Sequence, residues 1–251
     1  MEAECKPYDQ IILFGDSITQ MSSSQESGFG LQPALQDAYI RRLDVINRGF
    51  SGYTTAHAVK VFQKFFPKLE TARVQLMTIL FGANDACLPG NAQYVPLPTF
   101  KTNLKTIIQH PATQAQTPRI LLLTPTPINE YQVEGFDASK GNAHPSRTAS
   151  HTRQYADAVR EVGGELGVAV VDLWGAFMRV AGWDEGKPLD GSKEVPENEK
   201  LAGLLTDGLH LTAEGYRVVF GEVMGAVRRN WPELEPERMP MVFPGWVEAP
   251  M

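Results

Sequence analysis

Short apolar segments alternate with longer amphipathic segments along almost the whole chain, and this alternation restricts the fold more than any other feature. The apolar runs are mostly uninterrupted, as is typical of strands buried on both faces of a parallel sheet. Strands are predicted at residues 10–14, 43–46, 74–81, 119–124 and 168–172. Helices are predicted at residues 31–42, 55–66, 99–109, 153–166 and 213–229, the last with Thr212 as its N-cap.

Such strict alternation implies right-handed crossovers and helices on both faces of one sheet. The prediction is a three-layer α/β/α fold with a five-stranded parallel sheet in the flavodoxin-like order 2-1-3-4-5. In that order, ligands bind beyond the carboxyl ends of the first and third strands. Ser17 follows the first predicted strand and Asn84 follows the third. The expected binding place therefore contains both residues.

The composition is that of an ordinary globular protein, with 43% hydrophobic and 21% charged residues among 251. A net charge of -6 disfavours nucleic acid and anionic membrane surfaces as partners. The first residues are acidic, where a secretory or mitochondrial leader would be basic. With only two cysteines, Cys5 and Cys87, we expect free thiols and a cytoplasmic location.

The predicted organisation is one domain at residues 1–230 followed by a Pro-rich tail at residues 231–251. Apolar side chains in the tail suggest that it packs on the domain or on a neighbouring subunit, which would make a homodimer. Two polar stretches, residues 129–150 and 184–200, break the alternation and are read as long loops. They are either lids or plain solvated connections.

Four polar blocks stand where predicted strands end. They occupy residues 15–19 (Gly-Asp-Ser-Ile-Thr), 47–52 (Asn-Arg-Gly-Phe-Ser-Gly), 81–85 (Phe-Gly-Ala-Asn-Asp) and 207–211 (Asp-Gly-Leu-His-Leu). Each alone is an ordinary turn, and the first would simply cap a helix. Together, a serine after a buried strand and an Asp-x-x-His supply the nucleophile, base and base-orienting group of acyl transfer.

In this order the four blocks resemble those of the SGNH, or GDSL, hydrolases, a resemblance that spans residues 15–210. The second and third blocks and the tail are similar to the isoamyl acetate-hydrolysing esterase branch, in its fungal form. The chain departs from the pattern of this branch at residues 124–127, which read Thr-Pro-Thr-Pro where the branch would have a longer proline run before Glu130. This difference concerns the shape of the acyl pocket and not the catalytic residues.

The resemblance implies a serine esterase that acts on small, short-chain esters, without a metal or cofactor. Ser17 would be the nucleophile, His210 its base, and Asp207 the group that orients His210. The oxyanion would be bound by the backbone N–H groups of Ser17 and Gly52 and by the side-chain amide of Asn84.

Other interpretations fit some of these residues. The same triad could serve an acyltransferase, a thioesterase or a lipid deacylase, and a non-catalytic binding module could keep the fold. Ser51 lacks the Gly-x-Ser-x-Gly of a nucleophile elbow, because residue 53 is tyrosine. Gly-Phe-Gly at residues 28–30 is only a fragment of a dinucleotide fingerprint. None of the other histidines, His57, His110, His144 and His151, has metal-ligand spacing, and Asp16 and Asp85 are read as carboxylates that brace loops.

Overall fold

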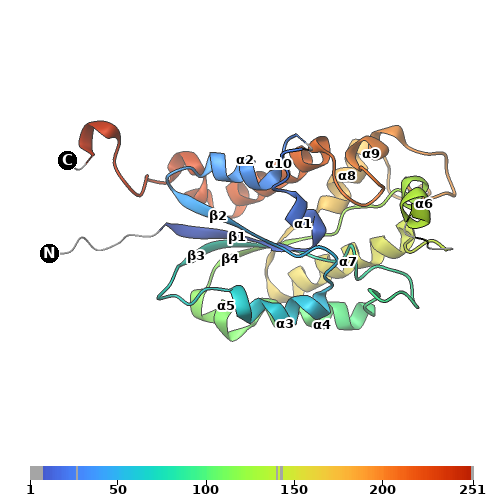
Figure 1. Cartoon of the computed structure of the whole chain (residues 1–251), viewed down its shortest axis with the longest axis horizontal. Coiled ribbons are helices and arrows are strands. Elements are labelled where there is room, and N and C mark those ends of the chain that lie inside the picture. The colour runs from blue at the N-terminus through green and yellow to red at the C-terminus, as the bar shows by residue number, and fades with distance from the viewer. Residues whose placement is uncertain (1–7, 27, 140, 142–143, 250–251) are drawn as a thin grey trace.

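The computed structural model describes residues 8–26, 28–139, 141 and 144–249, and its centre is one parallel sheet (Figure 1). The order of the strands is β2-β1-β3-β4-β5, which confirms the predicted topology. Within the described ranges the strands are β1 (Asp9–Gly15), β2 (Leu43–Gly49), β3 (Val74–Leu80), β4 (Arg119–Leu123) and β5 (Ala169–Val171).

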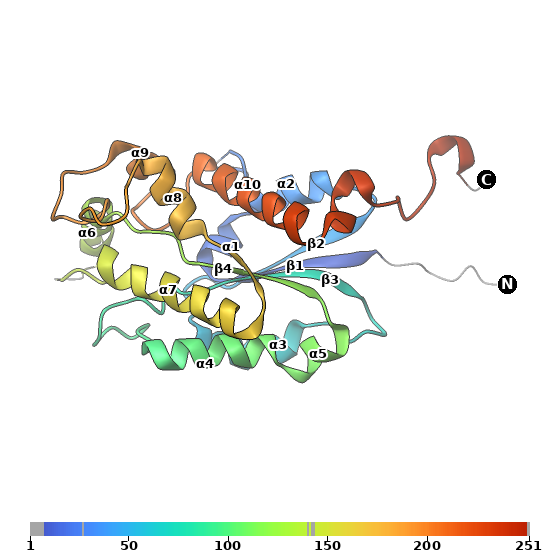
Figure 2. The same ribbon diagram turned by 180° about the vertical axis from the view of Figure 1, so that it is seen from behind.

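Helices cover both faces of the sheet, as Figures 1 and 2 show. One layer contains α2 (Leu31–Ala38), α8 (Leu173–Ala181) and α10 (Ala213–Asn230); the other contains α3 (Thr55–Phe65), α4 (Leu97–Ile108) and α7 (Ala149–Leu166). Because side chains alternate along a strand, β1 sends Ile11 and Leu13 into the first layer and Ile12 and Phe14 into the second. The sheet is therefore buried on both faces.

Loops at the carboxyl edge of the sheet bring the polar blocks together. Gly15, the last residue of β1, pairs with Gly49 of β2 on one side and with Leu80 of β3 on the other. The residues that follow these three positions therefore leave the sheet side by side. The short helix α1 (Ser17–Met21) starts at this edge, and α6 (Glu130–Ser139) and α9 (Glu199–Leu204) lie at the same end of the molecule (Figure 1).

The prediction of a long loop at residues 129–150 was wrong, because α6 occupies its first half. This helix has Gly135 in its middle and buries only Val133 and Asp137, so the sequence shows almost no amphipathic pattern there. The sequence reading also missed α8 and α9, and α5 (Pro111–Gln116), whose N-cap is His110. Cys87 is a buried free thiol as expected, whereas Cys5 lies outside the described residues.

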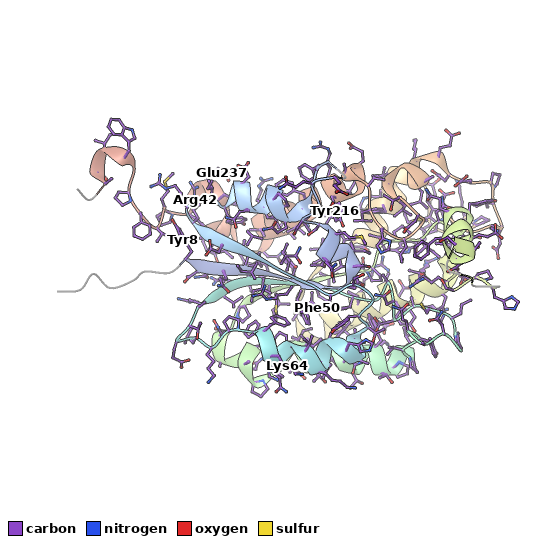
Figure 3. All side chains as sticks on the ribbon, viewed as in Figure 1. Tyr8, Arg42, Phe50, Lys64, Tyr216 and Glu237 are labelled. Carbon is purple, nitrogen blue, oxygen red and sulfur yellow. The ribbon has the colours of Figure 1, made fainter. Side chains whose placement is uncertain are left out.

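The C-terminal tail contacts the domain beside α2. The Tyr39 hydroxyl donates to the carbonyl of Leu234 (2.9 Å), and Nε of Arg42 donates to the carbonyl of Met239 (3.0 Å); Figure 3 marks Arg42 beside this segment. Further along, the side chain of Trp246 is 88% exposed. The contact of this tail with a neighbouring subunit stays a prediction. Within the described part of the chain, every helix is too short or too polar to traverse a lipid bilayer.

Candidate active site

Ser17, His210 and Asp207 form a continuous line of hydrogen bonds. Oγ of Ser17 lies 2.9 Å from Nε2 of His210, and Nδ1 of His210 lies 2.7 Å from Oδ2 of Asp207. A carboxylate can only accept, so Nδ1 carries the ring proton and Nε2 is left to accept the proton of the serine hydroxyl. This is the geometry in which a histidine can act as general base toward a serine.

The loop that carries His210 holds Asp207 in its ionised form. Burial alone would raise the pKa of Asp207, but hydrogen bonds from the ring and backbone of His210 and from the backbone of Leu209 outweigh burial and lower that pKa to about 2. Oδ1 accepts from the backbone N–H groups of Leu209 (3.1 Å) and His210 (2.8 Å). The turn passes through Gly208 at φ +83°, a left-handed conformation that favours glycine.

Ser17 is the first residue of α1 and is almost fully buried. Oδ1 of Asp16 accepts from the backbone N–H of Ile18 (2.9 Å) and so caps this helix. The hydroxyl of Tyr216, labelled in Figure 3, donates to the carbonyl of Ile18 (2.7 Å) and ties α1 to α10. The helix-cap reading of this block is therefore correct, and the same turn presents the serine to His210.

The three predicted oxyanion donors border the same cavity. Gly52 has φ +78°, and its carbonyl accepts from Nε2 of Gln93 (2.8 Å). Nδ2 of Asn84 donates one of its two N–H groups to the carbonyl of Tyr53 (2.9 Å). Ser17, Gly52 and Asn84 thus come together at the switch point between β1 and β3.

Two buried carboxylates lie behind these donors. Burial, with a smaller contribution from the neighbouring charge of Asp85, raises the pKa of Asp16 to about 7. Burial also raises the pKa of Asp85 to about 6, although bonds from the hydroxyl and backbone N–H of Thr55 oppose the shift. Oδ2 of each carboxylate has no hydrogen-bond partner among the described residues. Both residues brace loops, as expected, since each accepts a bond from the backbone at the start of a helix.

The cavity at the triad has a volume of about 260 Å³. Its wall contains the predicted Ser17, Gly52, Asn84 and His210 together with Ser51, Asn91, Gln93, Phe136, Asp137, Ser146, Arg147 and Leu209. Few of these side chains are apolar, and the ring of Phe136 lies edge-on to His210 with centroids 6.2 Å apart. The cavity is therefore small and lined mostly by polar side chains.

Sequence reasoning missed Gln93, Phe136 and Arg147 as parts of this site. Gln93 holds the carbonyl of Gly52, and Arg147 donates to the side-chain oxygen of Asn84 (3.3 Å). All three stand in stretches without strand or helix periodicity, so no spacing linked them to a catalytic block. The one available signal was an arginine inside a predicted polar loop at the ligand-binding edge.

Ser51 borders the cavity, but Nε2 of His210 is bonded to Ser17. The other histidines are occupied elsewhere: His57 and His110 accept backbone N–H groups at helix starts, His151 packs on the Tyr155 ring, and His144 is exposed. Residues 28–30 precede α2 and do not follow a strand. No cluster of three or more His, Cys, Asp or Glu side chains in the described ranges could hold a metal ion.

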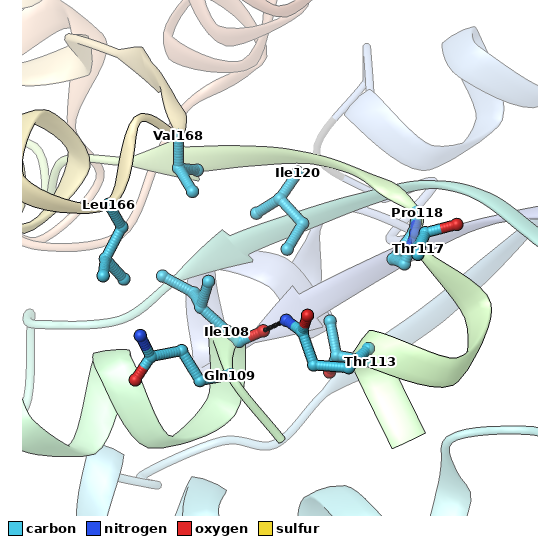
Figure 4. A pocket seen from close by; sticks show the side chains of 9 residues that line it. Ile108, Gln109, Thr113, Thr117, Pro118, Ile120, Leu166 and Val168 are labelled. Carbon is cyan, nitrogen blue, oxygen red and sulfur yellow. Dashed lines mark hydrogen bonds between the residues drawn. The ribbon is translucent and has the colours of Figure 1, made fainter. Parts of the chain in front are cut away.

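A larger cavity, of about 520 Å³, lies at the amino ends of β4 and β5 (Figure 4). Its wall consists of apolar, hydroxyl and amide side chains, including Ile108, Gln109, Thr113 and Leu166. It contains no histidine and no carboxylate. The larger cavity is therefore not the candidate active site. Ser17 and His210, which are hydrogen-bonded to each other, line the smaller one.

Comparisons with known proteins show the family of this chain. The model of the GDSL-like Lipase/Acylhydrolase family matches residues 13–218, a span that includes all four blocks. A GDSL esterase/lipase of Arabidopsis thaliana is 37% identical over 94% of this chain and 91% of its own. The isoamyl acetate-hydrolyzing esterase of Saccharomyces cerevisiae is 28% identical over 95% and 94%, and the human homologue of that esterase is 31% identical over 95% and 87%.

Solved structures share the fold. A lipase/acylhydrolase from Enterococcus faecalis superposes with a TM-score of 0.62 at 22% identity, over 93% of this chain and 98% of its own. An acetyl xylan esterase superposes with a TM-score of 0.65 at 21% identity, over 87% and 99%. The family model matches most of the chain, and a relative that is 37% identical aligns over most of its own length, so this chain belongs to the GDSL-like lipase/acylhydrolase family of carboxylic ester hydrolases.

Proposed function

We propose that this protein is a serine esterase that hydrolyses small, short-chain carboxylic esters through an acyl-enzyme intermediate. The observation that carries the proposal is the unbroken line of hydrogen bonds from Ser17 through His210 to Asp207, whose first two residues line one cavity. A buried serine hydroxyl bonded to a histidine whose other nitrogen faces a carboxylate is the arrangement that activates a nucleophile.

The reaction follows from these positions. Oγ of Ser17 attacks the ester carbonyl carbon while its proton passes to Nε2 of His210, and Asp207 stabilises the resulting imidazolium. The N–H groups of Ser17 and Gly52 and the amide of Asn84 bind the oxyanion of the tetrahedral intermediate. His210 then returns the proton to the leaving alkoxide, and an alcohol departs. Water, deprotonated by His210, attacks the acyl carbon; the bond from that carbon to Oγ of Ser17 then breaks, His210 returns the proton to Oγ, and the acid departs.

The size and lining of the cavity support a short acyl group. At about 260 Å³ it lies just below the range of roughly 300–1,000 Å³ that is usual for ligand pockets. Each further CH₂ adds about 0.8 kcal/mol of binding only where an apolar wall can receive it, and Phe136 and Leu209 are the large apolar side chains of this wall. The yeast relative is named for isoamyl acetate, an ester with a two-carbon acyl group.

The proposal also covers the location and the partners of the protein. We infer a cytoplasmic protein that meets its ester substrate in solution, without a stable membrane association, a cofactor or a nucleic-acid partner. A net charge of -6 supports the exclusion of polyanions. A homodimer formed through the C-terminal tail belongs to the same proposal, since apolar side chains of the tail such as Trp246 are exposed.

A panel of p-nitrophenyl esters of graded acyl length tests the proposal, with Ser17→Ala as the blank and Ser51→Ala as the matched control. We expect kcat/KM to be highest between acetyl and about hexanoyl, because the wall offers little apolar surface to longer chains. Ser51→Ala should keep this profile. A steady rise through dodecanoyl, or a jump in rate when the substrate forms micelles, would favour a lipid deacylase instead.

A further inference from the structure

Arg147 is a buried arginine beside the candidate oxyanion donors. Its side chain is only 5% exposed and borders the cavity at the triad. The guanidinium donates to three neutral oxygens: the carbonyl of Ala83 (2.8 Å), the hydroxyl of Ser146 (2.9 Å) and Oδ1 of Asn84 (3.3 Å). The first and third of these bonds end on the loop that carries the amide of Asn84.

Among the described residues, no carboxylate forms an ion pair with Arg147. Its positive charge nevertheless reaches the surrounding groups, since it lowers the pKa of both Asp16 and Cys87 against the larger effect of burial. A buried charge without a counter-ion is costly to a folded protein. Such a charge is favourable when negative charge appears nearby during a reaction.

The base of Arg147 is held firmly. The next residue, Thr148, caps α7 by accepting from the backbone N–H of His151 (3.2 Å). The preceding residue, Ser146, donates its backbone N–H to Oδ2 of Asp137 on α6 (2.7 Å). The backbone on both sides of Arg147 is therefore held in place by α7 and α6. Its guanidinium is held by the three bonds described above, as a preorganised group needs to be.

Arg147 also determines which way the amide of Asn84 faces. A guanidinium can only donate and a carbonyl can only accept. Oδ1 of Asn84 must therefore face Arg147, and Nδ2 must face the carbonyl of Tyr53. The second N–H of Nδ2 remains for the cavity. A flipped amide would present its oxygen to the oxyanion and would repel it.

We propose that Arg147 is a positioning residue of the oxyanion hole: its guanidinium orients the donor amide of Asn84 and supplies a permanent positive charge whose counter-ion is the oxyanion of the transition state. This rests on the proposed serine esterase function. It adds to the three donors named above a residue that orients one of them, Asn84, and that places a fixed positive charge beside them.

Two substitutions separate the charge from the bonding geometry. Arg147→Gln removes the charge, whereas Arg147→Lys keeps a charge but loses the planar fork that reaches several oxygens. With p-nitrophenyl acetate we expect Arg147→Gln to lower kcat roughly 10- to 100-fold with KM little changed, less than the 10²–10³-fold cost of losing a direct donor. Arg147→Lys should recover part of that loss. Arg179→Gln is the matched control, because Arg179 is an exposed arginine paired with Glu222.

A transition-state analogue distinguishes positioning from packing. A trifluoromethyl ketone forms a hemiketal oxyanion with the active-site serine, so its Ki should rise in Arg147→Gln by the same factor by which kcat/KM falls. The concentration of intact sites is measured by titration with an organophosphonate, so partial unfolding of a variant does not distort either quantity. A fall in kcat/KM with an unchanged Ki would mean that Arg147 only supports packing, and would overturn the proposal.

A double-mutant cycle tests whether Arg147 acts through Asn84. Arg147→Gln should cost much less activity in an Asn84→Ala background than in the wild type, because the amide that it orients is already absent. Fully additive losses would mean that Arg147 does not act through Asn84, and would overturn its role as a positioning residue. So would a rise in KM confined to esters with a carboxylate on the acyl group, which would make Arg147 a substrate-binding residue. Failure of the esterase function itself looks different, since the wild type would then neither hydrolyse esters nor bind the phosphonate.

Discussion

Oγ of Ser17 lies 2.9 Å from Nε2 of His210, although 193 positions separate the two residues. The contact exists because β1 delivers Ser17 at the centre of the sheet and the loop before α10 folds back over the same edge. A contact between the two ends of the domain depends on the whole fold. Its catalytic value therefore depends on the residues that hold each side in place.

Asp207→Asn tests the histidine side of this contact. The amide can donate to Nδ1, which would move the ring proton to Nε2 and leave no acceptor for the serine proton. We expect kcat to fall on the order of 10³–10⁴-fold. Asp184→Asn is the control, an exposed aspartate paired with Lys187. Steady-state kinetics of both variants decide the matter, and equal rates in the two would remove Asp207 from the mechanism.

Gly208→Ala tests the turn between Asp207 and His210. An added Cβ would lie 2.5 Å from the carbonyl oxygen of Asn129 and 2.6 Å from the backbone nitrogen of Val133, so the turn would have to move. Gly186→Ala is matched in φ, +88° against +83°, but its Cβ would meet no atom within 4 Å.

Both variants should lose about 1–2 kcal/mol of stability from left-handed strain. Urea unfolding should show a larger loss for Gly208→Ala, and only that variant should lose kcat. Equal losses of stability, or an unchanged kcat in Gly208→Ala, would show that the close approach of this turn to α6 has no part in placing His210.

Asp16→Asn tests the buried carboxylate behind the nucleophile. The folded-state pKa of Asp16 is raised from 3.8 to about 7, so between these values the unfolded chain releases a proton that the folded protein keeps. Stability must then fall as pH rises from about 4 to 7, and the loss levels off above 7. Asparagine retains the helix cap and does not titrate.

Near pH 4 the two proteins should have similar unfolding free energies, and by pH 8 the variant should be more stable by an amount on the order of a few kcal/mol. Urea unfolding at each pH measures the difference. A difference that is the same at pH 4 and pH 8 would mean that Asp16 is ionised throughout this range in the folded protein.

Much of the fold could be predicted because its signals are local. Mostly uninterrupted apolar runs marked all five strands, and five strands that alternate with helices suit the flavodoxin-like order, which is the order found. The polar blocks could be placed at one edge because parallel strands end together. Asp207 and His210 sit in one loop, so their convergence needed no long-range information.

The missed features depend on tertiary contacts. With glycine at position 135 and few buried side chains, α6 has a weak amphipathic pattern. Its contacts are with distant residues, such as the hydrogen bond from the Tyr131 hydroxyl to the carbonyl of Val195. Arg147 reaches the carbonyl of Ala83 across 64 positions of sequence. Nothing in the spacing of the polar residues near Arg147 indicates that partner. The candidate nucleophile was thus readable from its turn, whereas the residues that position the oxyanion donors required the structure.

The central claim is that Ser17 is the nucleophile, and labelling with an active-site-directed organophosphonate tests it most directly. The full-length protein is reacted to completion, digested, and mapped by mass spectrometry beside Ser17→Ala and Ser51→Ala. We predict one equivalent of label on Ser17, with esterase activity lost in proportion, full labelling of Ser51→Ala, and none of Ser17→Ala. Label on Ser51 in the wild type, or hydrolysis that continues in Ser17→Ala, would contradict the account.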